Sequence, residues 1–124
     1  MPSTFTIPLT TVAVGTRTFG PATLADTDTL VTLTIDRTVT GGFNSQPAST
    51  TARISIEQSN DGGSTWNELA ATTFVGGVFT MHGGLPVNSN DVGVFLLPGT
   101  GRRGRAVVTI TGAAVAVAGS LAIT

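Results

Sequence analysis

The chain has 124 residues, of which 40% are hydrophobic and only 10% are charged, and its formal net charge is −1. This length fits one domain, residues 1–124, and is too short for a β-propeller with blades of four strands each. No cysteine is present, no segment has the pattern of a signal peptide, and no run reaches the ~20 apolar residues of a membrane span. We therefore expect a protein made in a cytoplasm, with neither disulfides nor a membrane partner.

Residues 1–20 include Pro2 and Pro8 and predict an edge strand, or an arm that reaches a neighbouring molecule. After them the dominant hydrophobic period is two, which is typical of strands with one buried face. The predicted inward residues are Val31, Leu33 and Ile35; Ala52, Ile54 and Ile56; Val92, Val94 and Leu96; Ala106, Val108 and Ile110; and Val115, Val117, Leu121 and Ile123, with Gly119 in the same series.

Seven or eight short strands separated by Gly-, Pro- and Asn-rich turns predict an all-β fold, a single antiparallel β-sandwich. An immunoglobulin-like Greek key is favoured and a jelly roll is the second choice. The last two strands, 105–111 and 114–124, are expected to form a hairpin across the segment TGAA.

The segment SNDGGSTW, residues 59–66, resembles the Asp-box, a short hairpin motif known from sialidase-type propellers. The matching positions are Ser59, Asp61, Gly63, Thr65 and Trp66. An aspartate can accept backbone hydrogen bonds within a tight turn, and glycine can adopt the positive φ that the turn needs. The motif therefore predicts a structural hairpin, and its alternative role is to present Trp66 to a sugar.

The segment GTGRRG, residues 99–104, has the spacing of a dinucleotide-binding loop, but a strand follows it where that loop requires a helix. It contains Arg102, Arg103 and, directly after it, Arg105. These arginines are expected to form either a solvated turn or a partner-binding cluster, and their replacement by Ser is expected to leave folding nearly unchanged. A pI near 5.6 and the lack of flanking aromatic residues argue against nucleic acid.

No motif for catalysis, a cofactor or a metal ion is recognised. His82 is the single histidine, and it lacks the neighbouring ligands of a zinc site. Asp26 and Asp28 have the spacing of turn residues and lack the further carboxylates of a calcium loop. We therefore expect a protein that is not an enzyme.

A surface with so few charges is easier to understand if other molecules cover much of it. The segments IEQSNDGGSTWNELAATTFVGG, GRRGRAVVTITG and VAVAGSLAIT resemble small β-sandwich proteins of tailed bacteriophage virions. The resemblance implies a capsid decoration or cement protein that is assembled in the host cytoplasm. Its partner would be the major capsid protein or another virion protein, and it would form a homo-oligomer, often a trimer. A tail or baseplate component and a carbohydrate-binding module that uses Trp66 are the alternatives.

Overall fold

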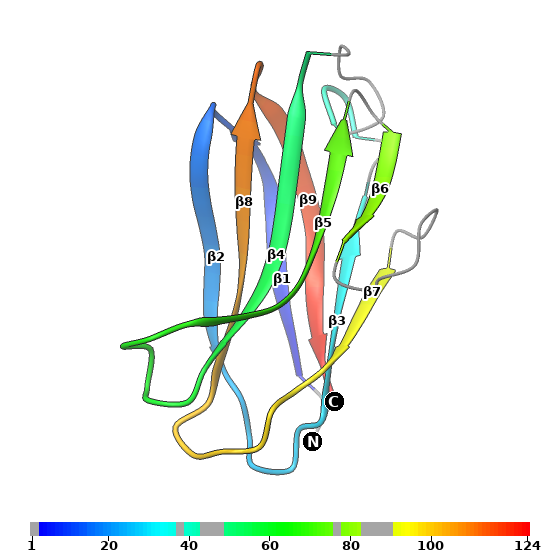
Figure 1. Ribbon diagram of the computed structural model, residues 1–124. Helices are drawn as coiled ribbons and strands as arrows, with labels where there is room; N and C mark the ends of the chain where they lie inside the picture. Colours follow the sequence, from blue (N-terminus) through cyan, green and yellow to red (C-terminus); the bar gives the residue numbers. More distant parts are fainter. Residues whose placement is uncertain (1–2, 37–38, 43–48, 76–77, 83–90) are drawn as a thin grey trace.

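The computed structural model describes residues 3–36, 39–42, 49–75, 78–82 and 91–124, and this part of the chain consists of strands and their connections (Figure 1). None of it forms a helix that could cross a membrane. The strands are β1 (Ser3–Val12), β2 (Gly15–Thr23), β3 (Leu30–Ile35), β4 (Thr51–Ser59), β5 (Asn67–Val75), β6 (Val78–His82), β7 (Asp91–Phe95), β8 (Arg103–Thr111) and β9 (Val115–Ile123).

The strands form two antiparallel sheets that face each other, so the predicted β-sandwich is confirmed. One sheet has the order β1-β9-β3-β7 and the other has the order β2-β8-β4-β5-β6. Strands β1 and β2 therefore each lie at a sheet edge, and both begin within residues 1–20.

The strand order identifies the topology as a jelly roll. β1 pairs with β9, β2 with β8, β3 with β7 and β4 with β5, and these pairs alternate between the two sheets. An immunoglobulin-like sandwich would instead place its first two strands side by side in one sheet. The favoured topology was thus wrong and the second choice was right, because alternation specifies which face is buried and not which strand is the neighbour.

The predicted hairpin of the last two strands is also wrong. β8 pairs with β2 and β4 in one sheet, whereas β9 pairs with β1 and β3 in the other. The connection between them crosses the sandwich instead of turning back within a sheet. Gly112 lies in this connection with a φ of +97°, and a Cβ there would be 2.5 Å from the Ser49 carbonyl oxygen, so the crossing passes close to another backbone segment.

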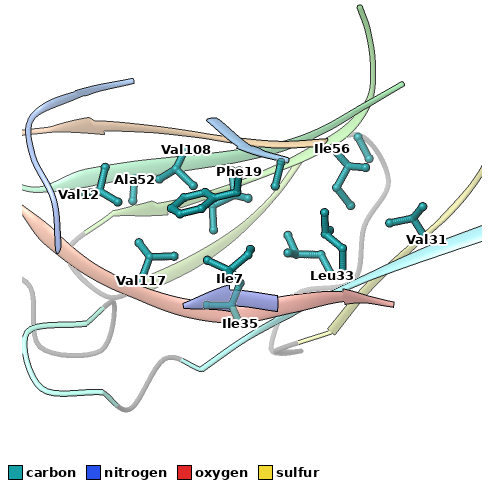
Figure 2. Close-up of a cluster of buried hydrophobic side chains, with 14 of the residues drawn as sticks. Ile7, Val12, Phe19, Val31, Leu33, Ile35, Ala52, Ile56, Val108 and Val117 are labelled. Atoms are coloured by element: carbon teal, nitrogen blue, oxygen red, sulfur yellow. The ribbon is translucent and has the colours of Figure 1, made fainter. Parts of the chain in front are cut away.

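The core fills the space between the sheets, as Figure 2 shows. The inward apolar positions predicted on β3, β4, β8 and β9 are buried, whereas Gly119 in the same series is half-buried. Val94 and Leu96 are partly buried against the same core, and the side chain of Val92 lies outside the described atoms. β1 and β2 add residues that the periodicity did not single out: Ile7, Val12 and Phe19. Each sheet therefore contributes one apolar face to a single shared core.

Gly119 on β9 lies directly against the backbone of the neighbouring strand β3. A Cβ at Gly119 would lie 2.0 Å from the Thr34 carbonyl oxygen, which is a backbone atom that a rotamer change cannot move. At Gly93, in the same sheet, the nearest atoms to an added Cβ are side-chain atoms at 3.8 and 3.9 Å.

We expect Gly119→Ala to lower the free energy of unfolding by about 1–3 kcal/mol, because β3 and β9 must move apart. Gly93→Ala is the matched control and should change stability by less than about 0.5 kcal/mol. Urea denaturation of both variants measures the difference, and equal stabilities would show that the strands separate at no cost.

Candidate functional site

The segment 59–66 forms the turn between the paired strands β4 and β5, as the sequence predicts. The Asp61 carboxylate accepts hydrogen bonds from the Ser59 hydroxyl (2.6 Å), the Ser64 and Thr65 backbone N–H groups (3.0 and 2.9 Å) and the Thr65 hydroxyl (2.6 Å). These bonds, led by that of Ser59, hold the pKa of Asp61 well below its ordinary value. Gly62 and Gly63 have φ values of +76° and +103°, which accounts for the two glycines.

Trp66 leaves this turn and packs on the outer surface of the five-stranded sheet. The Arg105 guanidinium lies 4.0 Å from the centre of the indole, and the Arg105 side chain also forms an ion pair of 2.7 Å with Glu57. The indole N–H donates to the Gly63 carbonyl at 3.1 Å. The polar group of Trp66 and one face of its ring are therefore used within the protein, which leaves less of the ring available to a sugar.

Arg102 is buried, with 4% of its surface exposed, and it does not project from a solvated turn. Its guanidinium donates to three backbone carbonyl groups: Leu97 at 3.0 Å, Asp28 at 2.9 Å, and Ala25. The Arg102 carbonyl in turn accepts from the Leu24 N–H at 3.1 Å. Arg102 thus ties the connection between β2 and β3 to the connection between β7 and β8.

Neighbouring polar groups tie the Asp61 turn to the same connection. The Gln58 amide donates to the Leu97 carbonyl (2.8 Å) and accepts from the Leu97 N–H (2.9 Å). Asn60 donates to the Pro98 carbonyl at 3.1 Å, and the Gly62 N–H donates to the Gly101 carbonyl at 2.9 Å. Residues 24–29, 59–66 and 96–102 therefore form one hydrogen-bonded end of the sandwich, at the bottom of Figure 1. We call it the clamped end.

The three arginines of the expected solvated turn or partner-binding cluster have separate environments. Arg103 and Arg105 belong to strand β8 and are half-buried on its outer side; Arg103 donates to the Arg102 carbonyl at 3.1 Å. Arg102 lies just before the strand, two residues ahead of Gly104, and so belongs to the same inward-facing series as Gly104 and Ala106. All three residues are buried. Extending the alternation by two residues would have placed Arg102 inside, so this residue lacks the exposed position on which the expectation of unchanged folding rested.

The remaining polar candidates do not form a chemical site in the part of the chain that is described. Asp28 is buried, and its carboxylate accepts a hydrogen bond of 2.6 Å from the Ala25 N–H, as is typical of an aspartate in a turn. Asp26 is exposed in the same turn. His82 ends β6, and its side chain lies outside the described atoms. Within the described ranges there is neither a cavity nor a group of three potential metal ligands.

The outer surfaces of the two sheets differ in charge. On the five-stranded sheet, β4, β5 and β8 carry two ion pairs, Arg53–Glu68 and Arg105–Glu57, each at 2.7 Å. By register, the outward positions of the four-stranded sheet carry one ionisable residue, Asp91 at the start of the edge strand β7, and are otherwise uncharged and mostly small; we call this surface the Thr/Ala face. Its residues are Thr4, Thr6, Leu30, Thr32, Thr34, Asp91, Gly93, Phe95, Ala118, Ser120 and Ala122, whereas Ala116, beyond them on β9, is buried beside Gly41.

Phe95 is the most exposed large hydrophobic residue described, at 80%, and the sequence analysis did not select it. It ends β7 opposite Leu30 in the Thr/Ala face, and Leu97, 46% exposed, follows it. Its position could have been inferred, because Val94 and Leu96 are inward and Phe95 must then point outward. An aromatic side chain left in water is a common anchor of protein interfaces.

Comparison with known proteins returned no match: no family model, no curated protein and no solved structure is similar to this chain.

The Asp61 carboxylate makes the turn sensitive to acid. Because the pKa of Asp61 is lower in the folded state than the unfolded value of about 3.9, its stabilising effect is complete above that value and is lost as the pH falls below it. We expect the wild-type protein to lose more stability below about pH 4 than Asp61→Asn, which has no carboxyl group to protonate. Unfolding free energies across this pH range test this, and parallel profiles for the two proteins would contradict it.

Arg102 and Arg103 provide a second, matched test. Arg102→Met leaves buried carbonyl groups without donors and should lower the unfolding free energy by about 2 kcal/mol or more. Arg103→Ser should change the unfolding free energy by less than about 0.5 kcal/mol, because the Arg102 carbonyl still accepts a hydrogen bond from the Leu24 N–H. Chemical denaturation measures both values; similar small losses would mean that the clamped end does not depend on Arg102.

Proposed function

We propose that this protein is a non-enzymatic structural component of a tailed bacteriophage particle, and that it attaches to the assembled capsid as a decoration or cement protein. The observation that carries the proposal is the Thr/Ala face with Phe95 exposed at its margin. The resemblance of three segments to phage virion proteins indicates the kind of particle. Jelly rolls are frequent in viral capsids, but they also form lectins and cupins, so the fold by itself supports the proposal only weakly.

The chemistry of the Thr/Ala face suits a broad contact. Small hydroxyl and methyl groups allow close approach, and a surface whose one ionisable residue, Asp91, lies on the edge strand β7 loses little ionic hydration when its centre is covered. Charged residues are depleted at the centres of protein interfaces for this reason. Phe95 adds an aromatic anchor that a pocket on the partner would fill.

The clamped end suits a mechanical role. Three connections are held by hydrogen bonds that Arg102 and Gln58 donate and that the Asp61 carboxylate accepts, so little conformational entropy remains to be lost when the protein attaches. Many copies on one particle would multiply a modest affinity per contact.

The alternatives have different support. A tail or baseplate component would use the same surface and would differ in the number of copies per particle. A carbohydrate-binding role needs Trp66, and the contacts of its ring with Arg105 and of its N–H with Gly63 reduce what the indole offers to a glycan.

Attachment can be tested by sedimenting lysates that contain the particles on a density gradient and measuring this chain against the major shell protein. We expect the wild-type protein to sediment with particles at a fixed, high ratio. Thr32→Lys places a charge at the centre of the Thr/Ala face and should reduce the bound fraction by about tenfold or more.

Thr109→Lys is the matched control, because Thr109 is equally half-buried on a central strand of the other sheet. It should leave attachment unchanged. A fixed but low ratio would assign the protein to the tail. Wild-type protein that stays at the top of the gradient would refute the proposal.

A further inference from the structure

The free edge of β1 is a second candidate interaction surface. β1 pairs with β9 on one side, and no described strand pairs with its other side. An unpaired strand edge presents backbone N–H and C=O groups that another strand can bind, and natural proteins usually protect such edges with charges, bulges or short strands. β1 is ten residues long and has no ionisable side chain.

The other three edge strands are better protected. β2 carries Arg17 and has a register shift between Phe19 and Ala22. β6 and β7 have only five residues each. Within β1 itself, Pro8 and a register shift between Ile7 and Thr10 interrupt the later half. The regular and unprotected part of the edge is therefore Ser3–Ile7.

We propose that two copies of the protein associate through this segment, with β1 of each copy pairing antiparallel to β1 of the other across a two-fold axis. The axis passes at Phe5, the middle residue of Ser3–Ile7. This inference rests on the strand edge and does not depend on attachment to a capsid.

The side chains of the segment are compatible with self-pairing. With the axis at Phe5, Thr4 lies opposite the partner's Thr6, and Thr6 opposite the partner's Thr4, on the outer side of the sheet. Facing threonines are favourable cross-strand pairs. Phe5 packs against the core but remains partly exposed, because the sheet ends beside it. The partner's Phe5 would cover this exposed side, and the contact is self-complementary, as a two-fold interface requires.

The assembly would join two four-stranded sheets into one continuous sheet of eight strands, by the strand-addition mode that many proteins use to bind peptides. The Thr/Ala faces of both copies would then form one surface.

The first test introduces charges of one sign at the edge of β1. Thr4 and Thr6 are exposed, so lysines there should not disturb folding, which circular dichroism can verify. Wild-type protein should sediment at twice the chain mass of 12.5 kDa. Thr4→Lys/Thr6→Lys should sediment as a monomer, because each lysine faces a lysine of the partner. Thr4→Glu/Thr6→Glu should also be monomeric, and mixing the two variants should restore the dimer.

Thr16→Lys/Thr18→Lys is the matched control, since both residues are exposed on the edge strand of the other sheet. It should remain dimeric. The register can be tested separately, because the chain has no native cysteine. Thr4→Cys mixed with Thr6→Cys should form a disulfide-linked dimer under oxidation, whereas neither variant alone should cross-link to a comparable extent.

Three results would overturn the proposal. The first is a wild-type protein that stays monomeric at high concentration, and the second is a species larger than a dimer. The third is a dimer that the β2 lysines dissociate and the β1 lysines do not. None of these results bears on whether the Thr/Ala face binds a shell.

Discussion

The structure depends on one constraint: each strand must bury one face in a core that both sheets share. With strands of five to ten residues and no helix in the described chain, no other element can cover the apolar side of either sheet. Residues such as Leu33 on one sheet and Ile54 on the other are therefore buried against each other's layer.

The clamped end follows from the same constraint applied to polar groups. A jelly roll passes its chain repeatedly from one sheet to the other, and each passage leaves backbone carbonyl and N–H groups without strand partners. Arg102 and Gln58 supply those partners from inside the protein. A buried guanidinium is tolerated because it donates to three carbonyl groups, although its Nε atom has no partner among the described atoms.

The difference in charge between the two outer surfaces bears most directly on the proposed function. Ion pairs hold long side chains over β4, β5 and β8, so that Ser55 and Ala71 are buried although they lie opposite each other on the outward side of that sheet. Among the described residues, no ion pair covers the Thr/Ala face, and only its end at Ala116 lies beneath another segment, around Gly41. Its small side chains leave the outward positions of β3 and the centre of β9 partly accessible, which is why we propose attachment through this surface and self-association through the edge beside it.

The sequence by itself determined the class of fold, the inward positions of β3, β4, β8 and β9, and the turn around Asp61. Period-two alternation and local turn chemistry are properties of neighbouring residues, so no tertiary information is needed to recognise them. Even the burial of Arg102 is present in the alternation that continues before β8.

Only the tertiary structure decided which strands are neighbours, because the same alternation fits an immunoglobulin-like sandwich and a jelly roll. It also decided that β8 and β9 lie in different sheets, that Arg105 covers the ring of Trp66, and that β1 has a free edge. These features depend on contacts between residues far apart in the chain, and the local pattern of each strand is the same whichever partner it has.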